Sequence, residues 1–357
     1  MSTTRFISTY SNSVANGSVT WQAPSNIALV KYWGKFGEQL PKNPSLSFTL
    51  RACHTKTTLS YFRKTGAGID FEVYLDGKRA IDFEPKIKDF FKRIAPYIPF
   101  LEDFTFRIET SNSFPHSSGI ASSASGMSAL ALCLLSIEKE MNPEMKDSFF
   151  LQKASFLSRL GSGSACRSVE GDLIVWGEHP EIESSSDLYG IKYPYKVHEC
   201  FKNYQDTILL VDKGEKEVSS TVGHKLMHEH PFAEHRFQQA KDHLSRLIPV
   251  LENGTISEFI KIVESEALSL HAMMLTSQPN FILMKPNTLE IINRIWKYRN
   301  DSGSAVCFTL DAGANVHVLY PESEKTSVLN FIRTELSQFC KNGEFIEDHI
   351  GFGAIRG

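Results

Sequence analysis

The sequence predicts an α+β protein of two lobes, with two layers of helices and strands in each lobe. Its 357 residues are about twice the roughly 150 residues of a common domain, which indicates two domains. Its composition, 41% hydrophobic and 22% charged, is that of an ordered globular chain. Segments with strand and helix patterns are mixed without strict alternation, which favours an α+β arrangement.

The first part of the chain is dominated by strand patterns. Residues 45–50 alternate polar and apolar side chains, and residues 57–62 and 71–75 are rich in β-forming types. We therefore expect three successive strands, each with one buried face. The Asp-Gly pair directly after them predicts a tight turn, because both residue types tolerate positive φ angles.

A loop that leads into a buried helix is expected next. A further strand pattern at residues 104–109 runs into the glycine- and serine-rich residues 111–126, and residues 127–137 are then apolar on nearly all sides. Another strand is expected at residues 171–176.

The domain boundary is expected near residue 190. Residues 178–186 are acidic and serine-rich and contain a proline, which is typical of a surface connection between lobes. This gives an N-terminal domain of residues 1–190 and a C-terminal domain of residues 191–357.

The second half has longer helical patterns. Apolar residues recur at helical spacing through residues 232–251 and 256–267, and Pro286 is well placed to open a third helix. The apolar face expected for that third helix consists of Leu289, Ile292, Ile295 and Trp296. Strands are expected at residues 207–211, 305–310 and 316–320, and a last helix at residues 324–339.

Charge and cysteine content exclude several classes of function. Lys and Arg total 38 against 41 Asp and Glu, so the net charge of −3 provides no large positive field for nucleic acid or an anionic membrane. The six cysteines are spread without a C-x-x-C pair, which fits reduced thiols in the cytoplasm. No signal-like start is seen, and the longest apolar stretch, residues 129–135, is far shorter than the roughly 20 residues of a membrane span.

The most informative segment is residues 115–126, between a strand and an apolar helix. Small residues let backbone amides approach an anion, hydroxyl groups donate to it, and the helix start adds about half a positive charge. The pattern predicts a phosphate-binding loop, although neither G-x-x-x-x-G-K-[ST] nor G-x-G-x-x-G is present. On composition alone, a flexible serine-rich loop before a core helix is equally compatible.

Two further clusters have the residue types of an anion site. Residues 161–168 combine glycines, serines and Arg167, whose guanidinium can hold a carboxylate or a phosphate through two parallel hydrogen bonds. Lys31, Tyr32 and Lys35 place two cations and a phenol after an apolar strand. The structural alternatives are an exposed turn for the first cluster and an edge strand with solvated charges for the second.

Asp311 lies between two apolar strand patterns, close to Gly313. Partial desolvation there would suit a base or a positioning group, and a strand-capping aspartate in a tight turn is the alternative. A histidine group that matches no known metal-site spacing is expected only to lead into a helix. It consists of His224, His228, His230 and His235.

Taken together, these clusters resemble the GHMP small-molecule kinase superfamily. Residues 115–124 are similar to its P-x-x-x-G-[IL]-x-S-S-A signature. Within the superfamily, residues 23–35, 161–168 and 311–315 resemble the diphosphomevalonate decarboxylase family, and the order and spacing agree from about residue 18 to residue 335.

The resemblance implies a nucleotide-binding N-terminal lobe, a ferredoxin-like C-terminal lobe and a site in the cleft between them. It implies ATP as co-substrate with Mg²⁺, and conversion of (R)-mevalonate 5-diphosphate to isopentenyl diphosphate, CO₂, ADP and phosphate, a step of isoprenoid biosynthesis. It further implies a cytoplasmic homodimer, with no nucleic-acid partner and no dedicated protein ligands for the metal.

Roles for individual residues follow from the same resemblance. Asp311 orients or deprotonates the 3-hydroxyl group of the substrate with Lys31 close to it, and Arg167 holds the substrate carboxylate. The residues implied for substrate binding are Tyr32, Lys35, Ser162, Gly163, Ser164 and Ser220. Those implied for ATP binding are Ser117, Ser118, Gly119, Ala121, Ser122 and Ser123.

The chain departs from the family pattern at residues 116–118, at Pro44 and at Ala314, and none of these departures removes a group to which chemistry is assigned. The extra hydroxyl groups at 117 and 118 are expected to alter nucleotide affinity. Loss of a proline at 314 is expected to loosen the loop of Asp311.

Three alternatives remain open. A decarboxylase of mevalonate 5-phosphate and a mevalonate 3-kinase are the nearest, but Tyr32, Lys35 and residues 216–221 favour a diphosphate. Asp311 with Arg167 favours decarboxylation over phosphorylation alone. A non-catalytic protein that binds a metal or a partner through its histidines is the third, and it would leave the other clusters without a role.

Overall fold

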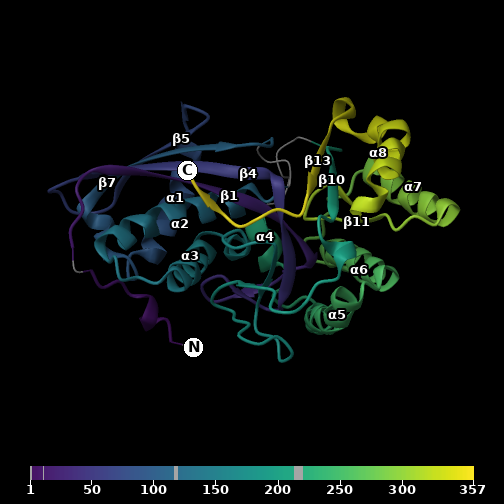
Figure 1. Ribbon diagram of the computed structural model, residues 1–357, viewed down its shortest axis with the longest axis horizontal. Helices are drawn as coiled ribbons and strands as arrows, with labels where there is room; N and C mark the ends of the chain where they lie inside the picture. The colour runs from purple at the N-terminus through teal and green to yellow at the C-terminus, as the bar shows by residue number, and fades with distance from the viewer. Residues whose placement is uncertain (1, 11, 116–119, 213–219) are drawn as a thin grey trace.

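The computed structural model describes the chain except residues 1, 11, 116–119 and 213–219, and it describes only the backbone of residues 220 and 221. Two lobes lie side by side, and each combines a sheet with helices (Figure 1). The predicted α+β fold is therefore confirmed.

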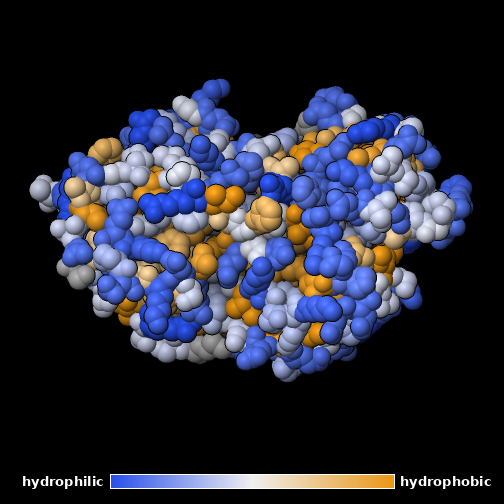
Figure 2. Space-filling view, viewed as in Figure 1, coloured by the Kyte–Doolittle hydropathy of each residue, from blue (hydrophilic) through white to orange (hydrophobic). Residues whose placement is uncertain are grey.

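Hydrophilic side chains cover much of the face seen in Figure 2, with smaller hydrophobic patches between them. Among the described residues, no helix combines the length and the apolar character needed to cross a bilayer.

The sheet of the N-terminal lobe runs in the order β14-β1-β4-β7-β5-β6, and β8 and β9 extend it beside β4. Its strands are β1 (Gly17–Val30), β4 (Ser45–Arg63), β5 (Asp70–Leu75), β6 (Lys78–Arg79), β7 (Phe104–Asn112), β8 (Leu173–Trp176), β9 (Ile191–Lys192) and β14 (Ile355–Arg356). A small hairpin of β2 (Lys35–Phe36) and β3 (Leu40–Pro41) follows β1. The predicted turn between β5 and β6 is confirmed, with φ of 49° at Asp76 and 76° at Gly77.

Strand β4 is longer than the sequence predicts. Residues 45–50 and 57–62, expected as two strands, belong to one strand that pairs with β1 along its length. Residues 45–50 are buried on both faces. Leu46, Phe48 and Leu50 join the apolar cluster shared with the C-terminal lobe. On the face expected to meet solvent, Ser45 contacts Arg167 and Trp176 of the N-terminal lobe instead. The prediction of one buried face is wrong for this half of the strand, whereas burial alternates from Cys53 to Tyr61.

Three helices cover one face of the first sheet: α1 (Glu84–Ile94), α2 (Ser122–Met141) and α3 (Asp147–Gly161). Helix α2 contains the apolar run predicted to be a buried helix, and residues 127–137 are all buried. A helix apolar on every side has no face to offer water, so it lies between the sheet and α3. Helix α2 also packs against the 3₁₀ turn Gly163–Arg167.

The sheet of the C-terminal lobe runs in the order β11-β12-β10-β13. One face packs against α7 and α8, and the other joins the apolar cluster formed with β1, β4, α5 and α6. The strands are β10 (Gln205–Leu209), β11 (Cys307–Thr309), β12 (Val316–Tyr320) and β13 (Phe345–His349). The helices are α4 (Ser220–Lys225), α5 (Ala233–Asn253), α6 (Ile256–Leu275), α7 (Pro286–Ser302) and α8 (Lys325–Phe331).

Helices α5 and α7 lie where the sequence predicts them, whereas α6 continues to Leu275, beyond the predicted end at residue 267. Leu289, expected on the apolar face of α7, is 48% exposed, because it points away from the α8 contact made by Ile292 and Ile295. The last predicted helix changes pitch: α8 ends at Phe331 and continues as a π turn (Ile332–Leu336) and a 3₁₀ turn (Ser337–Phe339).

The C-terminal segment ties the two lobes together. After β13 the chain crosses back to the N-terminal lobe, where β14 pairs with β1 (Figure 1). At the start of this crossing, Asp348 accepts hydrogen bonds from the backbone N–H groups of Arg51 (2.8 Å), Ala52 (2.7 Å) and Cys53 (2.8 Å). These groups lie where β4 bends from one lobe toward the other, so Asp348 satisfies donors that the strand ladder leaves open.

We expect the Asp348→Ala variant to lose on the order of 3 kcal/mol of unfolding free energy, because three amides lose a charged acceptor. Glu347→Ala is the matched control, since the neighbouring carboxylate pairs with Arg333 on the surface. Urea unfolding of both variants measures the difference. Equal losses in the two variants would contradict the role given to Asp348.

Candidate active site

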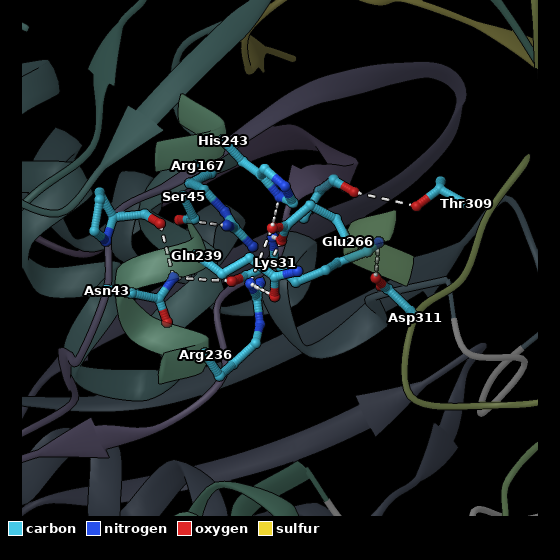
Figure 3. A network of polar contacts seen from close by, with 12 residues as sticks. Lys31, Asn43, Ser45, Arg167, Arg236, Gln239, His243, Glu266, Thr309 and Asp311 are labelled. Atoms are coloured by element: carbon cyan, nitrogen blue, oxygen red, sulfur yellow. Dashed lines mark hydrogen bonds and ion pairs between the residues drawn. The ribbon is translucent and has the colours of Figure 1, made fainter. Parts of the chain in front are cut away.

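An ion pair joins the two lobes at their junction. Lys31 directly follows β1, and its ammonium Nζ lies 3.1 Å from Oδ1 of Asp311, which follows β11. The Lys31 side chain is 2% exposed and that of Asp311 is 29% exposed. Burial lowers the pKa of the Lys31 ammonium, and Asp311 opposes that shift by its charge and its hydrogen bond. Figure 3 shows Asp311 at the tip of the Lys31 side chain. The alternative in which Lys31 holds its charge in solvent on an edge strand is wrong, because its side chain is buried.

Arg167 is buried next to this pair. It ends the 3₁₀ turn Gly163–Arg167, and one guanidinium nitrogen donates to Ser45 Oγ at 2.7 Å. Its Nε has no hydrogen-bond partner among the described residues. Burial lowers the pKa of Arg167, and Asp311 is among the groups that oppose the shift. Since arginine stays protonated in proteins, a buried N–H without an acceptor suits an anionic ligand.

Glycine at position 163 allows the close packing of Tyr32. A Cβ there would lie 2.8 Å from the Tyr32 hydroxyl, so any larger residue would displace the phenol. The Tyr32 ring also packs against Trp176 and His224, at centroid distances of 4.6 and 4.3 Å. The hydroxyl group is buried and has no hydrogen-bond partner among the described residues, so it can donate to a ligand.

Lys35 belongs to a group of like charges. Burial lowers the pKa of its ammonium, and the positive charges of Arg93 and Lys225 lower it further. Its Nζ donates to Gln39 Oε1 at 2.9 Å within the β2–β3 hairpin. Cations held this close repel one another, and a multiply charged anion would relieve that repulsion. Sequence reasoning missed Arg93 and Lys225, because neither stands in a local motif.

The start of α2 lies beside the 161–168 cluster. Ala121, its N-cap, has left-handed backbone angles, and no side chain of a described residue caps the first turn. Ser123 is exposed, and its hydroxyl lies 3.4 Å from that of Ser162. The free amides of a helix N-terminus attract anions, so the two predicted anion sites are neighbours.

Several predicted residues cannot be placed. Ser117, Ser118 and Gly119 lie outside the described residues, as does most of the run 216–221, and the side chain of Ser220 is not described. Ser122 and Ser164 are placed, both partly buried at the two anion sites.

The four histidines do not form a cluster. His224 and His230 are buried, His228 and His235 are exposed, and the described part of the chain contains no group of three or more side chains suited to hold a metal. His224 instead accepts a hydrogen bond from the Gly34 N–H at 2.9 Å through Nδ1. Burial lowers its pKa to about 3, so its ring is neutral.

Three side chains that sequence reasoning missed form hydrogen bonds to the backbone near the ion pair. Glu266 accepts a hydrogen bond from the Lys31 N–H, and Asn43 donates to the Lys31 carbonyl oxygen (Figure 3). The loop of Asp311 is held by Thr288, whose hydroxyl donates to the Ala314 carbonyl oxygen at 2.7 Å. Glu266 and Thr288 are single polar residues in helices, and such residues are too common to be singled out from sequence.

Comparisons with known proteins show the family of the chain. The family model described as the diphosphomevalonate decarboxylase-like N-terminal domain matches residues 23–187, and that of the mevalonate 5-diphosphate decarboxylase C-terminal domain matches residues 207–350. A crystal structure of a mevalonate diphosphate decarboxylase from Legionella pneumophila is 30% identical, covering 92% of this chain and all of that one with a TM-score of 0.78. The chain belongs to the diphosphomevalonate decarboxylase family.

Other members of this family are similar over the same length. A mevalonate diphosphate decarboxylase structure from Enterococcus faecalis is 27% identical with a TM-score of 0.81, covering 96% of this chain and 99% of that one. A structure of MDDEF in complex with MVAPP, AMPPCP and magnesium is 28% identical with a TM-score of 0.82 and the same coverage. The diphosphomevalonate decarboxylase of Ganoderma lucidum is 27% identical over 94% of this chain and 85% of its own. The family predicted from the sequence is thereby confirmed.

Acid should destabilise the protein through His271, a buried histidine of α6 beside Asp311. Burial lowers its pKa from 6.5 to about 4. Because the folded-state pKa is below the unfolded value, the unfolded chain binds more protons between pH 4 and 6.5, and stability is lost as the pH falls through that window. Between pH 7 and pH 5, we expect urea unfolding to show a loss on the order of 2 kcal/mol larger in the wild type than in His271→Gln. Parallel losses in both proteins would contradict this assignment.

Proposed function

We propose that this chain catalyses the ATP-dependent decarboxylation of (R)-mevalonate 5-diphosphate to isopentenyl diphosphate, a step of the mevalonate pathway. Phosphorylation of the 3-hydroxyl group comes first, and loss of phosphate and CO₂ follows. The observation that carries this proposal is the Lys31–Asp311 ion pair beside the buried Arg167, in a chain of the diphosphomevalonate decarboxylase family.

Asp311 acts on the 3-hydroxyl group of the substrate. Its carboxylate is partly exposed while its partner Lys31 is buried, so one side of the carboxylate can meet a ligand. The ammonium of Lys31 favours the ionised carboxylate, which orients the hydroxyl group or accepts its proton as the phosphoryl group arrives.

Arg167 directs the second half of the reaction. Hydroxide is a poor leaving group, but a phosphorylated 3-hydroxyl leaves readily and places positive charge on a tertiary carbon. Loss of CO₂ neutralises that charge, provided that the breaking C–C bond is aligned with the departing phosphate. The buried fork of Arg167, held by Ser45, suits this task because it binds a carboxylate in a fixed plane.

Two groups of polar residues hold the phosphates. Tyr32, Lys35, Ser162, Gly163 and Ser164, with Ser220, meet the substrate diphosphate, and we add Arg93 and Lys225 because their charges act on Lys35. The ATP phosphates meet the first turn of α2, where the hydroxyl groups of Ser122 and Ser123 and the amide of Ala121 lie. We assign Ser117, Ser118 and Gly119, which lie outside the described residues, to the same phosphates.

ATP and Mg²⁺ fit the residues present. Mg²⁺ usually binds substrate phosphates, water and one or two carboxylates rather than a cluster of protein ligands. Asp311 offers a partly exposed carboxylate at the junction, and the uncapped start of α2 offers donors for phosphate. Mg²⁺ would neutralise phosphate charge during the transfer.

The proposal extends to three further properties. The division into residues 1–190 and 191–357 is supported by the two family models, which match on either side of residue 190. A cytoplasmic location is supported by the six cysteines, which are all free thiols. A homodimer follows from the family resemblance alone, and light scattering of the purified protein would measure it.

The test of the function is to incubate the purified protein with ATP and Mg²⁺ and, in separate reactions, with mevalonate, its 5-phosphate or its 5-diphosphate. ADP and CO₂ are followed separately. Equal amounts of both from the diphosphate support the proposal. ADP without CO₂ would show a 3-kinase, and preference for the monophosphate would show the related decarboxylase.

We expect Asp311→Asn to fold and to bind ATP but to turn over on the order of 10²-fold more slowly or worse, because the amide cannot take a proton. Steady-state kinetics with the diphosphate measures the loss. Near-normal turnover in a folded variant would remove Asp311 from the mechanism.

Arg167→Lys should lower kcat at saturating diphosphate, and Arg167→Ala should lower it further. Lysine keeps the charge but loses the planar fork that fixes the carboxylate, and saturating substrate cannot restore alignment. Initial rates over a range of substrate concentrations separate the two effects. A raised KM with unchanged kcat would mean that Arg167 contributes only uniform binding.

A further inference from the structure

One helix contacts both members of the ion pair. Helix α6 carries Glu266, which bonds to the backbone of Lys31, and His271, which bonds to the backbone of Asp311. Lys31 belongs to the N-terminal lobe and Asp311 to the C-terminal lobe, and the chain separates them by 280 residues. Helix α6 therefore contacts two segments that are far apart in the sequence, so their alignment depends on contacts with other parts of the protein.

Glu266 fixes the Lys31 end. Its carboxylate accepts the Lys31 N–H at 2.8 Å, two guanidinium nitrogens of Arg236 and a ring nitrogen of His243 at 2.6 Å. Its side chain is fully buried. Burial would raise the pKa of the carboxyl, but Arg236, His243 and the Lys31 amide together lower it, so Glu266 is ionised. A buried carboxylate with this many donors is held in place, and Figure 3 shows Glu266 among them.

His271 fixes the other end. Its Nε2 lies 3.1 Å from the Asp311 carbonyl oxygen, and because that oxygen only accepts, Nε2 carries the proton. The residue is 2% exposed, and the low pKa of its ring leaves it neutral. The bond holds the main chain of Asp311 at the residue whose side chain meets Lys31.

We propose that His271 is a positioning residue: from the helix that holds Lys31 through Glu266, it fixes the backbone of Asp311 so that the Asp311 carboxylate meets Lys31 Nζ in the reactive arrangement. This inference rests on the function proposed above for Asp311. The rigid body between the two contacts is one turn and a half of α6, so their separation does not depend on loop conformation.

The test compares four variants with the wild type: His271→Leu, His271→Gln, His271→Asn and His230→Leu. Glutamine presents an N–H donor near the place of Nε2, leucine has none, and the amide of asparagine is too short to reach. A displacement of about 1 Å can cost 10²-fold in rate, so we expect His271→Leu and His271→Asn to lower kcat by on the order of 10- to 100-fold, with KM for both substrates within about twofold. His271→Gln should recover most of the loss.

His230→Leu is the matched control. His230 is also buried, and its Nε2 also donates to a carbonyl oxygen of α6, that of Met273, at 3.1 Å. Its hydrogen bonds among the described residues go to Met273, Thr276 and Phe232 and to neither member of the ion pair, so its loss should lower thermal stability while kcat stays within about twofold of the wild type.

Unchanged kcat in His271→Leu, or equal kcat in His271→Gln and His271→Asn, would overturn the proposal. So would an equal fall of kcat in His271→Leu and His230→Leu, which would show a general loss of stability. If His271→Leu does not fold, the comparison of glutamine with asparagine still decides. A wild-type protein that releases no CO₂ from the diphosphate would reject the proposed function instead, which separates the two failures.

Discussion

Burial of the Lys31 ammonium at the lobe junction is the constraint on which the site depends. Transfer of a cation out of water costs several kcal/mol unless a partner compensates it, and here the partner is Asp311 from the other lobe. The backbone of Lys31 is also fixed on both sides, its N–H by Glu266 and its carbonyl oxygen by Asn43. Neither lobe alone provides this set of contacts, so the site exists only when the lobes are docked.

The distribution of charge at the junction follows from the same constraint. Glu266 is neutralised within its own lobe by Arg236, which leaves Asp311 as the carboxylate opposite Lys31. Beside this pair, the positive charge of Arg167 acts on Tyr32, and those of Arg93 and Lys225 act on Lys35. The net charge of the whole chain is only −3. The positive field is therefore local, and it matches a small substrate with several negative charges rather than a polyanion.

The sequence was sufficient for the fold class, the family and most helices, because these depend on periodicity and on motifs whose residues are close in the chain. It failed where burial comes from distant segments. Residues 45–50 alternate as a half-buried strand would, yet their polar face is buried too, and Ser45 there contacts Arg167 and Trp176, which are far away in the sequence. Strands β13 and β14 were missed, since short segments become strands only when β10 and β1 offer them an edge.

The candidate site shows the same limit. Lys31, Arg167 and Asp311 were found because each stands in a recognisable block, and the structure brings them together at the junction. Glu266 and His271 stand in an ordinary amphipathic helix pattern, where a carboxylate and an imidazole are expected on a solvated face. Only the packing of α6 against β1 and β11 shows that both side chains point into the protein. The charged residues of the site can thus be recognised from local sequence motifs. The residues that position them can be recognised only from their contacts with distant segments of the chain.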